Sequence, residues 1–331
     1  MKHISIKDAT KISNRFLKML GLDESEYVHI TNNLIDAEMS GKRTHGLIRL
    51  LAFKKKNDEN KLNKEKLKVD ILNESPASLY IDGHNKLGYA IFYESLELAI
   101  NKVKNYGITT VGIKNIGMNG YIGGYARIAA ENNLIFIGFN SSPKGLVPYG
   151  AKKDLWGTNP LTISIPGNDG PVILDMASTN ITWGDIMIAI NEGKTLKQGS
   201  AIDAEGKPTT DPATAMKGGL LPFAGHKGSG LGFMVELLGG ALTGSRVGYS
   251  VPGNGGTFYI LINPELFLPV QQLKNTIDIA INELKNAPKM DGFNEIYYPG
   301  EKSNKRRKTT EELGRIDMDV TLLKKINKLL E

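Results

Sequence analysis

The chain of 331 residues contains no cysteine, which excludes disulfide bonds, thiolate nucleophiles and cysteine metal ligands. No apolar run approaches the roughly 20 residues that are needed to cross a bilayer. The first residues also lack the apolar core of a signal peptide. We therefore expect a soluble, cytoplasmic protein without a membrane partner. Histidine is scarce, and no two of the five are spaced like zinc ligands, so we expect no metal; they are His3, His29, His45, His84 and His226.

The formal net charge is +6, and the basic residues are concentrated in two runs, at residues 54–68 and 302–308. Neither run contains interleaved aromatic residues or a known nucleic-acid motif. We interpret both as solvated surface and expect no nucleic-acid partner. A modest positive field of this kind still favours anionic substrates.

The order of the predicted elements indicates an α/β protein with a helical N-terminal segment. Residues 5–53 show three amphipathic helices, and Ser5 with Asp8 forms a potential capping box for the first. A polar stretch follows. Strands and helices are then mixed, with strands expected at 69–73, 78–82, 109–113, 134–139, 161–165, 172–175 and 258–262, and helices at 87–103, 121–131, 179–190, 271–284 and 320–330. We divide the chain into a helical segment, 1–68, and an α/β body, 69–331, to which the C-terminal helix returns.

A glycine-rich stretch past the middle of the chain is the most distinctive local feature. Residues 225–230 read GHKGSG, and the apolar residues after them recur at helical spacing, which predicts a buried helix. Glycines and a helix N-terminus beside Lys227 would suit a phosphate group. A tight turn with a solvated lysine explains the pattern equally well. The loop does not follow a clear strand of a βαβ unit, so it does not fit a Rossmann fingerprint.

Two further segments carry side chains that are suited to chemistry. If a helix begins near Thr44, His45 and Arg49 share one face, where an imidazole can exchange a proton and a guanidinium can bind a carboxylate. The alternative is an ordinary polar helix start. Asp175 ends an apolar strand, where it could cap a helix or orient an imidazole. Residues 157–160, GTNP, form either a plain turn or part of a ligand wall.

Seven motifs in sequence order resemble the malate/L-lactate dehydrogenase family, which lacks the Rossmann fold and includes relatives acting on ureidoglycolate, sulfolactate and piperideine-2-carboxylate. The similarity covers nearly the whole chain. The motifs are THGLIR at 44–49, GTNP at 157–160, DMAS at 175–178, GKPTTDP at 206–212, GHKGSGL at 225–231, ELLGGALTG at 236–244 and PGE at 299–301.

This resemblance implies a mixed sheet with a non-Rossmann dinucleotide-binding arrangement, roughly at residues 108–250, and a homodimer. It implies hydride transfer between NAD or NADP (NADH or NADPH) and a small 2-hydroxy or 2-keto acid, with His45, Arg49 and Asp175 as catalytic residues. Substrate contacts are implied for Thr44, Arg49, Thr158 and Asn159. The implied cofactor residues are Ile173, Leu174, Asp175, Met176, Ala177, Ser178, Thr179, His226, Lys227, Pro299, Gly300 and Glu301.

The chain departs from the family pattern at one position. Many members have a histidine that acts as acid or base where this chain has Met118, and a thioether cannot transfer a proton. Three interpretations stay open: a 2-hydroxy-acid dehydrogenase, a reductase of cyclic ketimines such as piperideine- or pyrroline-2-carboxylate, or a catalytically weakened relative that binds the dinucleotide. In the first case, His45 would supply the proton alone, and the turnover of reduction should fall at alkaline pH.

Overall fold

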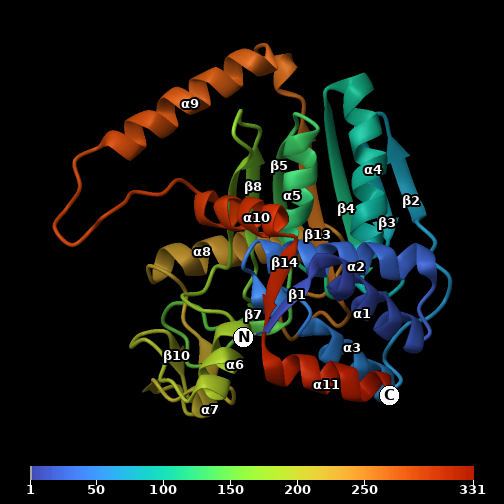
Figure 1. Cartoon of the computed structure of the whole chain (residues 1–331), viewed down its shortest axis with the longest axis vertical. Helices are drawn as coiled ribbons and strands as arrows, with labels where there is room; N and C mark the ends of the chain where they lie inside the picture. Colours follow the sequence, from blue (N-terminus) through green and yellow to red (C-terminus); the bar gives the residue numbers. More distant parts are fainter. Residues whose placement is uncertain (1) are drawn as a thin grey trace.

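A computed structural model describes residues 2–331 and contains a central mixed sheet of seven strands, whose arrangement can be followed in Figure 1. The strands follow the order β2-β3-β4-β13-β5-β8-β9, which is not a Rossmann order. Only the β3–β4 pair is parallel, and the five other pairs are antiparallel. This confirms the predicted mixed α/β fold. The strands are β2 (Asp70–Ser75), β3 (Ser78–Asp82), β4 (Ile108–Ile116), β5 (Ile135–Asn140), β8 (Leu161–Ile165), β9 (Val172–Met176) and β13 (Gly255–Ile262).

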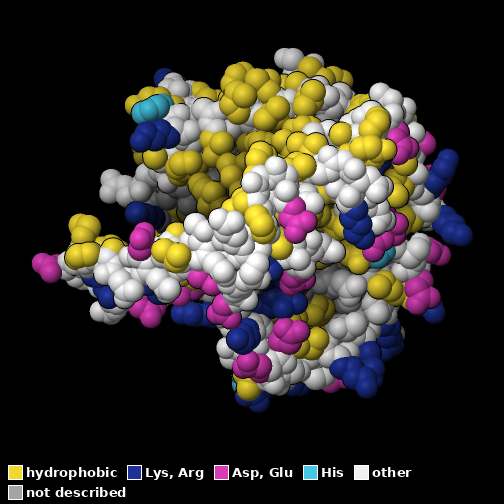
Figure 2. All heavy atoms as spheres, turned by 90° about the horizontal axis from the view of Figure 1, so that it is seen from above, with side chains coloured by type: hydrophobic (Ala, Val, Ile, Leu, Met, Phe, Trp, Pro, Cys, Tyr) yellow, Lys and Arg dark blue, Asp and Glu magenta, His cyan; other side chains and the backbone are white. Residues whose placement is uncertain are grey.

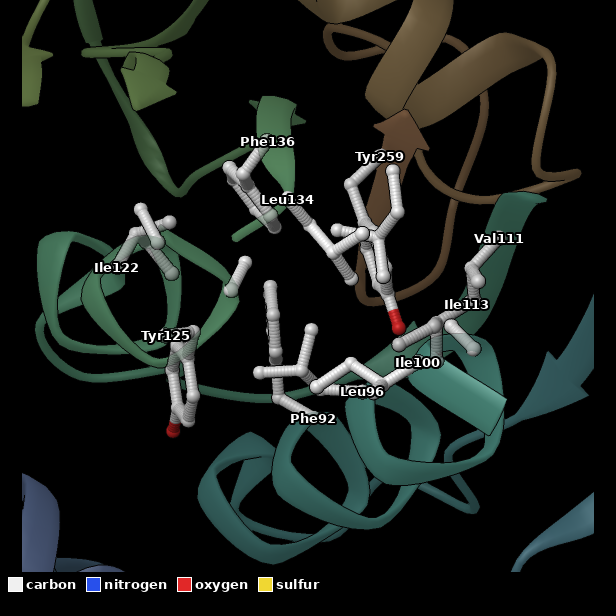
Figure 3. Close-up of a cluster of buried hydrophobic side chains, with 14 of the residues drawn as sticks. Phe92, Leu96, Ile100, Val111, Ile113, Ile122, Tyr125, Leu134, Phe136 and Tyr259 are labelled. Carbon is white, nitrogen blue, oxygen red and sulfur yellow. The ribbon is translucent and has the colours of Figure 1, made fainter. Parts of the chain in front are cut away.

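Two helices, α4 (Gly88–Tyr106) and α5 (Ile122–Glu131), cover one face of this sheet. Alternate residues of the strands point into the layer between sheet and helices, as the alternating burial of β5 shows. Aromatic rings fill the middle of this layer (Figure 3): Phe92 of α4 stacks on Tyr259 at 5.2 Å and on Tyr125 at 4.2 Å. The Tyr259 hydroxyl lies 2.9 Å from the Ser95 hydroxyl, so the buried phenol is hydrogen-bonded.

The helical N-terminal segment contains α1 (Ile6–Met19), α2 (Glu24–Met39), the short 3-10 helix η1 (Arg43–His45) and α3 (Arg49–Asp58). Ser5 caps α1 as predicted, because its side chain accepts the Asp8 N–H at 3.0 Å. The segment shares a core with the other end of the chain, where β14 (Arg315–Met318) pairs with β1 (Lys2–Ser5) and α11 (Val320–Leu330) packs on α1. The C-terminal helix thus returns to the N-terminal helices. The domain boundary at residue 68 stays a prediction.

A second, five-stranded sheet is built from segments in which the sequence predicted no strand. It has the order β11-β10-β12-β6-β7 and carries α6 (Trp183–Glu192) and α7 (Pro212–Ala215). Helix α6 begins four residues later than predicted, because Thr182 and Asp185 form a capping box and Thr179 bridges to Pro222. The strands are β6 (Lys144–Leu146), β7 (Trp156–Gly157), β10 (Ala201–Ile202), β11 (Pro208–Thr209) and β12 (Gly219–Leu220).

The helix after the glycine loop is not buried as the sequence predicted. Helix α8 (His226–Val235) continues into the π-helix η2 (Glu236–Ala241), and Met234 and Leu242 are exposed. Two of its glycines face the protein: a Cβ at Gly232 would lie 2.8 Å from Leu146, and one at Gly239 2.7 Å from the backbone of Ser141. Close backbone packing therefore turns the glycine face inward and several of the apolar side chains outward.

A long helix, α9 (Val270–Asn286), follows the short 3-10 helix η3 (Pro264–Leu266) and projects from the body (Figure 1). None of its residues is buried. The chain then returns through an extended segment to α10 (Glu301–Leu313), which packs on α2. Residues 302–308, interpreted above as a basic surface run, form the first part of α10, which lacks an apolar stripe. Among the described residues, no helix is both long and apolar enough to cross a membrane.

Candidate active site

His45 and Arg49 lie in two consecutive elements, and not on one helix face as the sequence predicted. His45 ends η1, whereas Arg49 is the first residue of α3. Gly46 between them is extended, with φ −85° and ψ −150°, and this breaks the helix. The two side chains still interact electrostatically, because the positive charge of Arg49 is one cause of the lowered pKa of His45.

The imidazole of His45 is neutral at ordinary pH. Burial, followed by the charges of Arg49 and Lys42, lowers its pKa to about 3. The Thr44 hydroxyl lies 3.1 Å from Nδ1, which leaves Nε2 for a ligand. The neutral imidazole is the form that accepts a proton from a hydroxyl group, but with a pKa of about 3 it is a weak base until a bound anion raises that pKa. The turnover of reduction can fall at alkaline pH, as predicted above, only if a bound anion offsets the Arg49 and Lys42 charges and so raises the pKa of His45.

The Arg49 guanidinium keeps unused donors. Its Nε is buried without a hydrogen-bond partner among residues 2–331, and its Nη1 lies 4.0 Å from the Met118 sulfur, a weak acceptor. The buried Tyr89 hydroxyl also has no partner within the described chain. An unpaired buried donor is costly, so a ligand carboxylate would satisfy Arg49.

A cavity of about 340 Å³ brings together two distant segments that the sequence analysis assigned to the cofactor. Ile173, Leu174 and Asp175 line it from β9, while Pro299 and Gly300 line it from the segment before α10. The contact is a backbone contact: the Ile173 N–H donates to the Pro299 carbonyl at 3.1 Å. Gly300 has φ +87°, and a Cβ there would lie 2.9 Å from the Ile173 carbonyl oxygen, so this approach requires glycine.

The donor groups at this cavity fit a phosphate. Lys302 and Ser303 line it from the first turn of α10, whose N-terminus has no side-chain cap, and Lys42 adds a positive charge. Glu301 points its carboxylate elsewhere, to Lys285 and Lys305, each at 2.7 Å. Although burial opposes its charge, these lysines keep the Glu301 pKa below its usual range. Glu301 therefore supports the helix start and does not line the cavity.

The segment after Asp175 leads from this cavity to α8. Met176 and Ala177 continue the chain, and Ser178 reaches the turn before α8, where its carbonyl accepts the Phe223 N–H at 3.1 Å. From residue 173 to 178 an extended chain spans roughly 17 Å, a length suited to an extended dinucleotide. At the far end, His226 and Lys227 are exposed in the first turn of α8, outside the cavity.

Asp175 accepts two hydrogen bonds, from the Thr162 hydroxyl at 2.8 Å and from the Gly123 N–H at 3.0 Å. It thus caps α5 and not the next helix. Burial raises the pKa of its carboxyl group, although the two hydrogen bonds oppose this. Neither partner is an imidazole. Its assignment as a catalytic residue remains a prediction, and the structure gives it a capping position at the cavity wall.

Asn159 is fully buried, and its side chain is used by the protein. Its amide donates to the Gly232 carbonyl at 2.9 Å and to Glu236 at 2.8 Å, and its carbonyl oxygen accepts the Ser142 N–H. Thr158 is half-buried beside Ser142. The structure therefore places Asn159 behind the wall of the site. The predicted substrate contacts of Thr158 and Asn159 remain untested.

The structure adds cavity residues that the sequence analysis missed. Lys42 precedes the His45 turn, and Tyr121 and Tyr298 also line the cavity. Burial, together with the Asp175 charge, raises the pKa of Tyr121 to about 12. Of these three residues, only Lys42 could have been inferred from the sequence, because it lies three positions before His45. The tyrosines come from segments whose proximity depends on the fold.

The non-Rossmann mixed sheet, the guanidinium with an unused buried donor and the lysine-lined cavity fit one class of protein: an oxidoreductase that binds a dinucleotide and acts on a small carboxylic acid. The particular family follows from comparison. A profile described as malate/L-lactate dehydrogenase matches residues 4–327, and the chain belongs to this family. It is an NAD(P)-dependent dehydrogenase that transfers a hydride between nicotinamide and a small 2-hydroxy or 2-keto acid.

Individual relatives support this assignment. The chain is 34% identical to an L-sulfolactate dehydrogenase of Methanocaldococcus jannaschii, over 92% of this chain and 90% of the relative. It is 30% identical to an NAD-dependent ureidoglycolate dehydrogenase of Escherichia coli K12, over 88% and 86%. The structure of malate dehydrogenase from Entamoeba histolytica superimposes with a TM-score of 0.93 at 26% identity, covering 99% and 97%. A piperideine-2-carboxylate reductase of Pseudomonas syringae, at 24% identity and a TM-score of 0.88, covering 99% of this chain and all of the reductase, shares the fold.

Proposed function

We propose that the protein interconverts a small anionic 2-hydroxy acid, such as malate or sulfolactate, and its 2-keto acid, with His45 exchanging the proton and Arg49 binding the carboxylate. The observation that carries this proposal is the neutral imidazole of His45 beside a guanidinium whose buried Nε has no partner in residues 2–331. The nicotinamide cofactor, when bound, accepts or supplies the hydride.

The proposed roles follow from the chemistry of the two side chains. Arg49 holds the carboxylate, which places the neighbouring hydroxyl carbon at a fixed distance from the His45 turn. In oxidation, Nε2 of His45 takes the hydroxyl proton. In reduction, the bound carboxylate partly cancels the Arg49 charge, so the His45 pKa rises and the imidazolium can return the proton.

We propose that the cofactor lies along residues 173–179. Its phosphates would contact Lys42 and the uncapped start of α10 at one end, or the start of α8 with Lys227 at the other. Both ends offer a helix start without a side-chain cap and a lysine.

The test is turnover of His45→Gln on a panel of 2-hydroxy acids, 2-keto acids and cyclic imines with NADH and NADPH. Glutamine keeps a polar side chain but cannot transfer a proton, so kcat should fall by roughly 10²–10⁴ with cofactor binding unchanged. His84→Gln, which changes a half-exposed histidine in the turn after β3, is the matched control. Near-normal turnover of His45→Gln would mean that the proton comes from another group.

A cyclic ketimine reductase is the second candidate. It is favoured by Met118, which places an apolar thioether, and not an imidazole, against Arg49. A cyclic imine with a 2-carboxylate could use Arg49 in the same way while its ring contacts Met118. The same panel distinguishes the two functions, because a ketimine reductase would prefer cyclic imines over open-chain keto acids.

We also propose that the enzyme works as a homodimer in the cytoplasm. Helix α9 projects without a buried residue, and it and the segment after it expose Ile279, Met290 and Phe293. Figure 2 shows apolar side chains gathered around the hollow beside this projecting part. A second copy of the chain would cover these apolar side chains.

A further inference from the structure

Glu38 is a buried acid that directly supports the turn carrying His45. It lies one residue before the end of α2 and is 7% exposed. Its Oε1 accepts the Leu47 N–H at 2.8 Å. An ideal Cβ at Gly46 would lie 2.1 Å from this same oxygen and 2.4 Å from the carboxyl carbon. The carboxylate therefore occupies the space where any side chain at position 46 would have to lie.

This contact explains the backbone of the turn. Gly46 is extended and separates η1 from α3, which gives His45 and Arg49 their separate orientations. The Leu47 N–H has no helical partner after such a break, and Glu38 satisfies it. A side chain that fixes the two residues after His45 also fixes the direction in which the His45 ring leaves the backbone.

The charged groups around Glu38 come from two elements. Arg43 lies on the turn itself, and Arg306 lies on α10, where its Cδ would be 2.7 Å from a Cβ at Gly41. The other nearby acid of α2, Asp36, is held by Arg307 of α10 at 2.7 Å and lies 3.8 Å from Arg127 of α5. Burial raises the pKa of Glu38 to about 7, against the opposing Leu47 hydrogen bond and the two arginines.

We propose that Glu38 is a positioning residue of the dehydrogenase: its carboxylate holds the Gly46–Leu47 peptide and so orients His45 for proton transfer. This inference rests on the role proposed above for His45. The ionised carboxylate is the stronger acceptor for the Leu47 N–H. The turn should therefore be held best when Glu38 is charged, and kcat should rise as the pH passes upward through about 7.

The experiment compares Glu38→Ala and Glu38→Gln with wild type, using NADH or NADPH and the best substrate of the panel. Small misplacement of a catalytic group costs up to about 10²-fold in rate, so Glu38→Ala should lower kcat roughly 10–100-fold while the cofactor Kd stays within about twofold. Glu38→Gln keeps a neutral acceptor oxygen, like the protonated acid, so its kcat should lie between those of Glu38→Ala and wild type and should show no rise near pH 7. Glu24→Gln, an exposed change at the other end of α2, is the matched control.

The outcomes separate the two proposals. Wild-type kcat in Glu38→Ala, or an unchanged pH profile in Glu38→Gln, overturns the positioning role, as does an equal loss of kcat and of cofactor binding. If His45→Gln is fully active, the proposed role of His45 fails first, whatever Glu38 does. If His45→Gln is inactive and Glu38→Ala shows the selective, partly Gln-rescued loss of kcat, the inference stands. Thermal melts of each variant ensure that folded protein is compared.

Discussion

Replacement of Lys86 by methionine should destabilise the protein strongly, because it leaves a carboxylate buried without its partner. Lys86 Nζ lies 3.0 Å from Glu26 Oε2, with side-chain exposures of 2% and 1%. The same Nζ donates to the Glu65 carbonyl at 2.5 Å. The pair thus links α2, the loop before α4 and the polar stretch after α3 in one buried contact.

The magnitude follows from burial and not from distance. Breaking a buried pair by removing one partner costs about 3–5 kcal/mol. With an unfolding entropy of roughly 2.1 cal/mol/K per residue, a chain of 331 residues that unfolds cooperatively should lose about 4–7 °C in Tm. Lys54 and Asp58 are closer, at 2.6 Å, but their side chains are 30% and 55% exposed. Lys54→Met should therefore cost only about 0.5 kcal/mol.

The pH dependence gives a second, independent check. Burial already raises the pKa of Glu26 in the wild type, although Lys86 opposes this rise, and loss of Lys86 should raise it further. An acid with a raised pKa in the folded state loses stability as the pH rises from its unfolded pKa through its folded pKa. The difference between Lys86→Met and wild type should thus be largest at alkaline pH and shrink as Glu26 is protonated.

The assay is chemical and thermal unfolding of wild type, Lys86→Met, Lys54→Met and the double variant Lys86→Met/Glu26→Gln at several pH values. The double variant removes the stranded charge and should be more stable than Lys86→Met alone. A Lys86→Met variant within 1 kcal/mol of wild type at every pH would contradict the predicted cost of the stranded carboxylate. A double variant no more stable than the single one would contradict it as well.

Three further predictions concern function. Arg49→Lys keeps the charge but loses the two-pronged geometry, so the KM for the carboxylate substrate should rise more than kcat falls; steady-state kinetics test this, and an unchanged KM contradicts it. Lys227→Ala should weaken NAD(P)H binding by about 1–3 kcal/mol, because a charge-assisted hydrogen bond is lost. Fluorescence titration measures this affinity, and an unchanged value would show that Lys227 does not contact the cofactor. Light scattering at micromolar concentration should show a dimer, and a stable monomer would refute the proposed assembly.

The sequence alone determined the features that depend on neighbouring residues. The Ser5 cap, the amphipathic stripe of α1 and the alternating strands follow from local chemistry and periodicity, and the structure contains them. The motifs around His45, Asp175 and Lys227 also identified the family correctly. These features involve residues that are close in the chain, so they can be predicted from the sequence without knowledge of the fold.

Features that join distant segments depend on tertiary contacts and could not be predicted from the sequence. The contact of Ile173 with Pro299 creates the cavity from residues more than a hundred positions apart. Gly232 and Gly239 pack closely against the protein, so Met234 and Leu242 are exposed although the apolar pattern predicted a buried helix. Glu38 reached the Gly46–Leu47 peptide across a turn and thereby separated His45 from Arg49's helix. In each case a long-range steric or hydrogen-bonding constraint, absent from local periodicity, set the geometry of the site.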